Sequence, residues 1–473
     1  TGYKNTASGY NSLRYNTTGD NNTASGFYSL SANTTGDNNI AYGYYSLYAN
    51  TTGTRNIAIG FRAYDNADAE NDNLAIGYDA LGGAINGGEY NVAVGNYTLD
   101  ANTSGDQNTA IGYNALSANT NSYNTALGYA SLLANTTGSY NTAVGNSALS
   151  ANTTASHNTA SGYHALYSNT TGNKNTAIGY EALEENITGE KNTAIGYHAL
   201  MANTEGDFNT STGYGALEMN TTGNQNTATG YQALEMNTTG DNNTAVGYST
   251  LNANTTGYKN VAVGNHALNA NTEGMENVAI SGFTSLYNNT TGSQNIAIGA
   301  ASLYNNETGN QNIAIGRASL YSNTASNNVG IGHESLKANT TGANNTSLGY
   351  NAGDVITTGS NNVIIGKGAD PSANSGTNQI VIGQGAAGQA DNSVVLGNAD
   401  VTKVYASQDA GATLHAGSLN LGGTAVTATA AELNLLDGAT SLGGAANITG
   451  LSDGLIEYSS LYLGYDPSST TTS

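Results

Sequence analysis

A short repeat of nearly constant length runs through most of this chain of 473 residues. The full unit reads N-T-A-I-G-Y-x-A-L-x-x-N-T-T-G-x-x, and its first asparagine can be aligned in 22 units from Asn5 to Asn362. Of the 21 intervals, 17 are 17 residues long, two are 18 and two are 16. Low complexity alone is compatible with disorder, but a disordered chain has no need to keep such a register. A fixed short period is instead typical of a solenoid.

Each unit joins the residue types of a strand to those of a turn. The stretch from Asn to Leu is rich in β-branched and aromatic residues, which favour strand, and the Asn-Thr-Thr-Gly that follows supplies turn chemistry. Because 17 residues cannot bury a core alone, the units must stack, with their backbones paired at about 4.8 Å per coil. The sequence therefore predicts an all-β fold, a parallel β-solenoid or β-roll of about 22 stacked coils and roughly 100 Å.

Because the units stack, the side chain at each position of the unit has a fixed orientation, either toward the interior or toward solvent. A Leu lies four residues after the Gly, and we expect this column to form the structural core. Ala or Ser precedes the Leu, and Ala lies two residues before the Gly; small residues at fixed places indicate close approach of another backbone. The position two after the Gly varies freely, as at Gln232, and is expected to face solvent. The predicted core column includes Leu13, Leu30, Leu47, Leu116, Leu149, Leu183, Leu217, Leu268 and Leu320.

Composition excludes several classes of protein. The chain has 11 basic and 33 acidic residues, a net charge of −22, so a nucleic-acid partner is not expected. No apolar run reaches the ~20 residues of a membrane span, so membrane insertion is not expected either. The absence of Cys rules out disulfides, zinc thiolates and cysteine nucleophiles. The chain begins with Thr1 inside a unit, so we expect it to be an excerpt of a longer protein.

The character of the sequence changes toward its end. Strand-like segments richer in Ile and Val follow Asn362, and residues 398–473 lose the repeat. We therefore expect a shaft over 1–397 and a C-terminal joint or cap of mixed structure over 398–473. A capping box at Thr429-Ala430-Ala431-Glu432 predicts a short helix near 430–436. In this interpretation Leu433 and Leu436 would meet their copies in an oligomer.

The units resemble the head repeats of trimeric autotransporter adhesins, which form β-rolls. The N-T-A-x-G-Y-x-A-L-x-x-N-T-T-G form is more closely similar to repeats in tail fibre proteins of marine bacteriophages. The segment Val401–Tyr405 and the T-A-A-E-L-N-L-L-D-G run at 429–438 are similar to segments that recur in phage fibres. The period is longer than that of the adhesins, and no C-terminal autoproteolytic domain or membrane anchor is visible.

The resemblance implies an elongated homotrimeric fibre, located in a virion or at a cell surface. It implies as partners its own copies, neighbouring fibre or virion proteins, and a host cell-surface glycan as a further candidate. The expected function is the shaft of a phage tail fibre that projects a host-recognition element. The alternative is a bacterial extracellular adhesin or surface filament of the autotransporter type.

Two motifs suggest catalysis or nucleotide binding. The run Gly383-Gln384-Gly385-Ala386-Ala387-Gly388 matches G-x-G-x-x-G, but no helix is predicted after it, so the phosphate-binding geometry would be missing. Glu218 and Glu235 occupy equivalent positions one coil apart, near the spacing of a retaining glycosidase. Nothing in the sequence separates their roles as acid and nucleophile. We expect no enzymatic activity, no catalytic residues and no cofactor.

A third pattern concerns metal binding. His164, Glu181 and His198 share one position in three successive coils, at steps of about 4.8 Å. The two imidazoles would lie about 10 Å apart on a solvent-facing surface, which favours a surface ladder over a metal site. We therefore expect no metal.

Two further columns repeat with the unit. The tyrosine after the Gly could cover the coils as a stacked ladder or present a sugar-binding stripe, and the ladder is favoured. The Asn-Thr-Thr sequon is interpreted first as a structural turn. Examples are Tyr10, Tyr113, Tyr180 and Tyr231 for the first column, and Asn16, Asn135 and Asn220 for the second.

Overall fold

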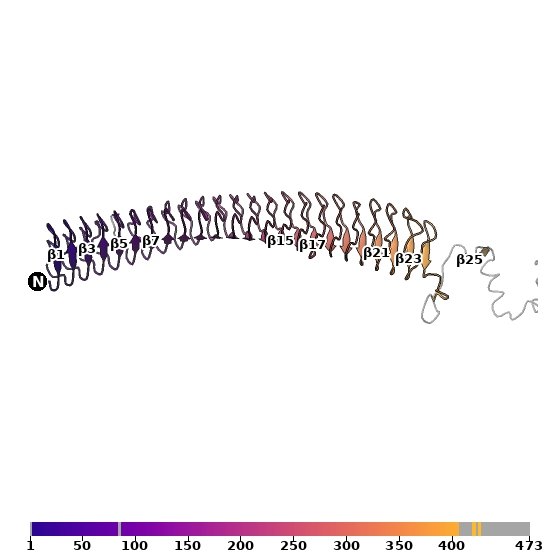
Figure 1. Cartoon of the computed structure of the whole chain (residues 1–473), viewed down its shortest axis with the longest axis horizontal. Helices are drawn as coiled ribbons and strands as arrows, with labels where there is room; N and C mark the ends of the chain where they lie inside the picture. Colours follow the sequence, from indigo (N-terminus) through magenta and orange to yellow (C-terminus); the bar gives the residue numbers. More distant parts are fainter. Residues whose placement is uncertain (1, 84–86, 406–418, 422–423, 427–473) are drawn as a thin grey trace, which may run out of the picture. The chain divides into compact units, whose positions relative to one another are not determined.

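The computed structural model describes residues 2–83, 87–405, 419–421 and 424–426. The chain divides into two compact units, Thr1–Val401 and Thr402–Ser473. The first unit is a single stack of coils (Figure 1), which confirms the predicted parallel β-solenoid. The expected helix at 430–436, with Leu433 and Leu436, lies outside the described residues, and the described part of the chain contains strands but no helix.

Every coil of the first unit contributes one strand of three residues to a 24-stranded sheet, in which each strand pairs in parallel with the next. The two strands beyond the 22 aligned units are β23 and β24, in the segment richer in Ile and Val. The second unit contains an antiparallel pair, β25 (Leu419–Leu421) and β26 (Thr424–Val426). The strands of the stack are β1 (Thr6–Ser8), β2 (Thr23–Ser25), β3 (Ile40–Tyr42), β4 (Ile57–Ile59), β5 (Leu74–Ile76), β6 (Val92–Val94), β7 (Thr109–Ile111), β8 (Thr125–Leu127), β9 (Thr142–Val144), β10 (Thr159–Ser161), β11 (Thr176–Ile178), β12 (Thr193–Ile195), β13 (Thr210–Thr212), β14 (Thr227–Thr229), β15 (Thr244–Val246), β16 (Val261–Val263), β17 (Val278–Ile280), β18 (Ile296–Ile298), β19 (Ile313–Ile315), β20 (Val329–Ile331), β21 (Thr346–Leu348), β22 (Val363–Ile365), β23 (Ile380–Ile382) and β24 (Val394–Leu396).

The strands are shorter than the Asn-to-Leu stretch that the sequence favours. In the coil of β11 the strand ends at Ile178, because Gly179 takes a φ of 141° and turns the chain. The core residue Leu183 then adopts a left-handed φ of 56°, as the core leucines of the other coils also do. Left-handed conformations are costly for residues with a Cβ. The coil is therefore a short strand followed by a tightly turning return.

Backbone pairing between coils continues outside the strands. In the coil of β11, the Leu183 N–H donates to the Ala199 carbonyl at 3.0 Å, and the Glu185 N–H donates to the Met201 carbonyl at 2.9 Å. Equivalent bonds recur from coil to coil along the stack. Each coil thus hydrogen-bonds to the next at several points of its circuit, which is what a 17-residue unit needs in order to be ordered.

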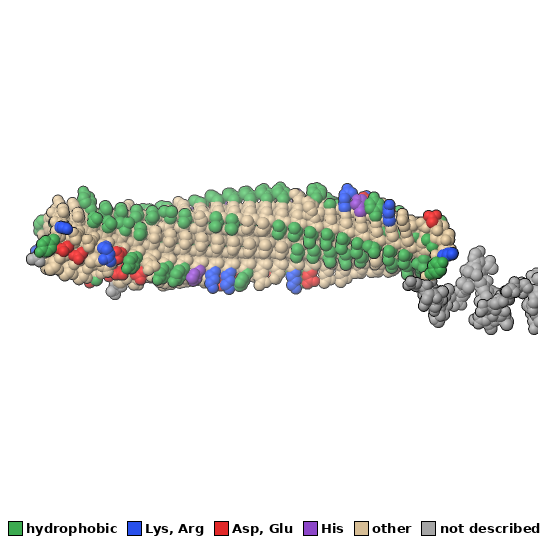
Figure 2. Space-filling view, turned by 90° about the horizontal axis from the view of Figure 1, so that it is seen from below, with side chains coloured by type: hydrophobic (Ala, Val, Ile, Leu, Met, Phe, Trp, Pro, Cys, Tyr) green, Lys and Arg blue, Asp and Glu red, His purple; other side chains and the backbone are tan. Residues whose placement is uncertain are grey.

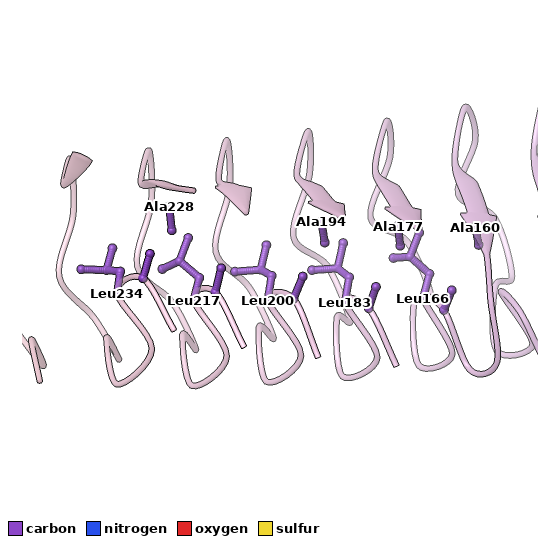
Figure 3. Close-up of a cluster of buried hydrophobic side chains, with 14 of the residues drawn as sticks. Ala160, Leu166, Ala177, Leu183, Ala194, Leu200, Leu217, Ala228 and Leu234 are labelled. Carbon is purple, nitrogen blue, oxygen red and sulfur yellow. The ribbon is translucent and has the colours of Figure 1, made fainter. Parts of the chain in front are cut away.

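The core consists of two facing columns inside the coils (Figure 3). The middle residue of each strand, such as Ala177, points inward toward the leucine column, such as Leu183, and both are fully buried. Leu13, in the first coil, is only partly buried because no coil covers it on one side. Tyr64 takes the leucine position in the coil of β4, fully buried, and its hydroxyl oxygen accepts a hydrogen bond from Asn73 Nδ2 at 2.7 Å.

The alanine column was expected to mark close approach of another backbone. In the structure the alanines are buried against leucines of the same chain. Their small size fits the narrow interior of a 17-residue coil. They therefore provide no surface through which copies of the chain could associate.

Two columns of buried asparagines complete the interior. Asn192, which opens a unit, donates its N–H to Asn175 Oδ1 at 2.9 Å and its Nδ2 to the Gly206 carbonyl at 2.7 Å. Asn203, from the Asn-Thr turn, donates Nδ2 to Asn186 Oδ1 at 2.8 Å and to the same Gly206 carbonyl at 3.0 Å. The side-chain amides of both columns thus satisfy backbone groups in the tight turns, where regular pairing is impossible.

Candidate functional site

A stack of tyrosine rings covers one face of the middle coils. Neighbouring ring centroids lie 4.9 to 5.2 Å apart, and their planes are within 14° of parallel. Each ring is a little under half exposed. The stack consists of Tyr163, Tyr180, Tyr197, Tyr214, Tyr231 and Tyr248.

This geometry bears on the choice between a covering ladder and a sugar-binding stripe. A ring that stacks on both neighbours has both faces covered, so only its edge and hydroxyl reach solvent. Sugar binding on an aromatic platform needs an open ring face. The faces of the four inner rings, Tyr180 to Tyr231, are therefore not available to a glycan, which favours the covering role.

The tyrosine column is interrupted near the extra residue at Ser281. Ala300 occupies the tyrosine position in the coil of β18, and an open depression is lined there by Phe283, Arg317 and Tyr321, among others. Phe283 is 61% exposed. Phe283 stacks on no other ring among the described residues and shares this depression with Arg317, so this irregular place is a better candidate for glycan contact than the stacked rings.

Beside the tyrosines, the structure brings together histidines and glutamates of two adjacent columns. The first column is the variable position after the Gly, with His164, Glu181 and His198; the second is the position after the core Leu, with Glu184 and Glu218. These five residues are called the His–Glu cluster below. His164 Nδ1 lies 3.0 Å from Glu184 Oε1, and His198 lies 2.9 Å from Glu181 Oε2 and 3.2 Å from Glu218 Oε1.

The cluster lies on a less exposed surface than expected. Side-chain exposures of the five residues are between 19% and 24%, so the variable position is half-buried here; Gln232 is half-buried as well, whereas Arg62 is exposed. Sequence reasoning found the first column but missed Glu184. Glu184 could have been identified from its position directly after the core Leu183, because that part of the coil lies next to the variable position.

The two glutamates considered as a glycosidase pair have separate partners. Glu218 faces His198, whereas Glu235 accepts hydrogen bonds from Gln232 Nε2 at 2.8 Å and from Asn252 Nδ2 at 2.7 Å. Both lie on the outside of a regular coil. The arrangement offers no distinct acid and base roles and no enclosing cleft around the two carboxylates.

The glycine-rich run and the sequons are both parts of the coil architecture. After Gly388 the described chain passes through turns into β24 rather than into a helix, so no helix N-terminus faces the run. In the sequons, Asn135 and Asn220 are fully buried with their amides hydrogen-bonded, and Asn16 in the first coil is half-buried. An amide held inside the coil is not accessible for glycosylation.

The outer face of the sheet carries no charge. Each strand points its first and third residues outward, and these positions in all 24 strands hold Thr, Ser, Val, Ile, Leu or Tyr. From β16 onward they are almost entirely Val and Ile, including Ile298 and Ile315 at 37% exposure. In Figure 2, seen from the side on which Figure 1 draws β15–β23, rows of hydrophobic side chains run along this part of the stack.

The structure thus defines a parallel β-solenoid built from tandem 17-residue repeats. The chain matches no protein-family model and no curated protein. Within the described part of the chain, no helix has the length and apolar character needed to cross a membrane.

Proposed function

We propose that this chain is a structural fibre protein, the shaft of a phage tail fibre that projects a host-recognition element. The observation that carries the proposal is the unbroken pairing of 24 coils, which spans about 110 Å at 4.8 Å per strand. Most surface positions are repeated in every coil, so the surface is similar along the whole stack. A uniform surface of this kind suits a spacer. A receptor-binding tip is more often built from irregular loops on a rigid scaffold.

The proposed shaft is a homotrimer, associated through the outer face of the sheet. The chain has a net charge of −22, so association through most other surfaces would bring like charges together. The outer face avoids this repulsion because its outward positions are uncharged. Its Val and Ile columns at β16–β24 would also bury apolar surface, the main driving force of association.

The remaining partners follow from the same proposal. Neighbouring fibre or virion proteins would attach at the ends of the shaft, and the proposed location is the virion. A host glycan, as a further partner, would bind the depression at Phe283 rather than the tyrosine stack, since an open ring face is needed. The shaft itself is proposed to be non-catalytic, because Glu218 and Glu235 have separate partners on a regular surface.

Light scattering of the purified chain, with electron micrographs of the particles, tests the proposal. We expect a mass of about three times 48.0 kDa and rods whose length falls by about 14 Å when residues 175–225, three whole units, are deleted. Ile298→Lys with Ile315→Lys should shift the mass toward monomer. The matched control is Gln294→Lys with Gln311→Lys, at exposed positions of the same two coils, and it should leave the assembly intact.

A stable folded monomer at micromolar concentration would refute the trimer. Globular particles instead of rods would refute the shaft. Rods isolated from bacterial surfaces rather than from virions would favour the adhesin alternative.

A further inference from the structure

We propose that His164, Glu181 and Glu184 bind one divalent transition-metal ion of the zinc type on the surface of the coils of β10 and β11. The proposal is independent of the fibre function. It rests on three properties of the His–Glu cluster: the spacing of its donor atoms, its charge and the fixed orientation of its imidazoles.

The first property is donor spacing. One ligand atom from each of His164, Glu181 and Glu184 can be chosen so that all three lie within 4.8 Å of one another, and His164 Nδ1 is already 3.0 Å from Glu184 Oε1. Ligand atoms around a tetrahedral zinc ion lie about 3.3 Å apart, given metal–ligand distances of about 2.0–2.1 Å. Small rotations of the two glutamate side chains would therefore bring the three donors to that spacing.

The second property is charge. Three carboxylates, those of Glu181, Glu184 and Glu218, have the two imidazoles as their ion-pair partners, and within the described residues no Lys or Arg forms an ion pair with them. Three carboxylates therefore face two imidazoles on a half-buried surface, and a divalent cation would offset the excess of negative charge.

The third property is the orientation of the imidazoles. The His164 ring stacks on Tyr163 at 3.9 Å and on Tyr167 at 4.6 Å between centroids, so its Nδ1 is held toward Glu184. The His198 ring stacks on Tyr197 at 3.9 Å. Rings held in this way lose little freedom when a ligand binds.

His198 lies next to the proposed site. Its Nδ1 is hydrogen-bonded to Glu218 Oε1 at 3.2 Å, and its Nε2 lies 2.9 Å from Glu181 Oε2 but is buried without a hydrogen-bond partner among the described residues. The chemistry of one imidazole and two carboxylates suits zinc and neighbouring first-row metals better than it suits calcium or magnesium.

Calorimetric titration of the full chain with zinc chloride at pH 7.5 tests the site. We expect one ion bound per chain, with affinity in the micromolar range or tighter. Glu184→Gln and His164→Gln should each weaken binding at least 10-fold. The matched control is Glu235→Gln, which lies in the Glu184 column but is held by two amides, and it should bind zinc as the wild type does.

The variants also distinguish between two roles of the His–Glu cluster, a metal site and a purely structural ladder of hydrogen bonds. Circular dichroism and melting of Glu184→Gln without zinc establish that it is folded. The proposal is wrong if the wild type binds no zinc at micromolar concentration. It is also wrong if folded Glu184→Gln and His164→Gln bind zinc as tightly as the wild type, because the ion would then be bound elsewhere.

Discussion

The side-chain amide of Asn203 donates a hydrogen bond to Oδ1 of Asn186, one coil earlier, at an N···O distance of 2.8 Å. The same relationship links Asn220 to Asn203 at 2.8 Å and Asn237 to Asn220 at 2.7 Å. All of these side chains are fully buried. Amides can form such a continuous ladder because each one both donates and accepts, so this column fixes the register between successive turns.

We expect Asn220→Asp to destabilise the stack strongly. Asn220 Nδ2 donates to Asn203 Oδ1 and to the Gly223 carbonyl at 3.0 Å, and a carboxylate would place an oxygen against these two acceptors. Leaving buried groups unsatisfied and burying a charge together cost several kcal/mol. Thermal melting followed by circular dichroism measures the loss. Gln225→Glu, at an exposed position in the same coil, is the control and should change the melting temperature little.

The core column gives a second prediction. Leu183→Asp buries a carboxylate among alanines and leucines, which costs several kcal/mol unless the group is protonated. Gln232→Ala removes a half-buried side chain and one hydrogen bond to Glu235, so a cost of about 1 kcal/mol or less is expected. Denaturant unfolding of both variants provides the comparison. Equal losses would contradict the assignment of these two positions to interior and surface.

The sequence was sufficient to predict the period, the stacking and the parallel solenoid, because one residue type at one position in many units must occupy one environment. It also indicated that Leu183 and its equivalents face inward. It did not indicate the left-handed backbone of these leucines, since Leu ordinarily avoids that region. That conformation is imposed by the tight return of the coil and by the pairing to the next coil, neither of which a linear pattern specifies.

The columns of polar residues were harder to interpret. Asn-Thr-Thr-Gly suggested a turn, which is correct, but asparagine is usually exposed, so the burial of Asn203 was not anticipated. The His–Glu cluster shows a similar gap. His164 and Glu181 share a column and were found by alignment, whereas Glu184 meets His164 only because of the way the coil turns between Glu181 and Glu184. Contacts between different columns depend on the cross-section of the coil, which the period alone does not determine.

Gly179 gives a third prediction, through close approach of backbones. It has a φ of 141°, and a Cβ there would lie well inside contact distance of the Gly196 carbonyl in the next coil. Gly179→Ala should therefore cost several kcal/mol, since the conformation is essentially restricted to glycine and the neighbour is backbone. The measurement is the melting temperature of the variant.

The control for this change is Gly215→Ala. Gly215 has a φ of 59° at the variable position, where other coils place residues with a Cβ, and the one close contact of its Cβ would be Glu218 Oε2 at 2.9 Å, with Gln232 Cγ at an ordinary 3.7 Å. That flexible carboxylate can move. The control should cost about 1–2 kcal/mol, the usual left-handed penalty. A larger loss for Gly215→Ala than for Gly179→Ala would contradict the close-packed glycine column.

The last prediction concerns the carboxylate of Asp370, near the C-terminal end of the stack. Burial, together with the negative charge of Asp354, raises the pKa of Asp370 from 3.8 to about 6, although a backbone hydrogen bond from Val355 opposes the shift. Its Oδ1 is buried and has no hydrogen-bond partner among the described residues. The folded state therefore favours the protonated form more than the unfolded state does.

A raised carboxyl pKa makes the contribution of Asp370 to the free energy of unfolding fall as the pH rises from about 4 to about 6. Above pH 6 the carboxylate is ionised in both states, and the folded stack bears the cost of holding it half-buried. Asp370→Asn removes this ionisation, and its amide can face Asp354, so we expect it to stabilise the chain at pH 7.5 by roughly 1–2 kcal/mol. The gain should shrink as the pH approaches 4. Melting temperatures of wild type and variant between pH 4 and 7.5 measure the effect, with exposed Asp400→Asn as the control. A gain that is independent of pH would show that ionisation of Asp370 is not its cause.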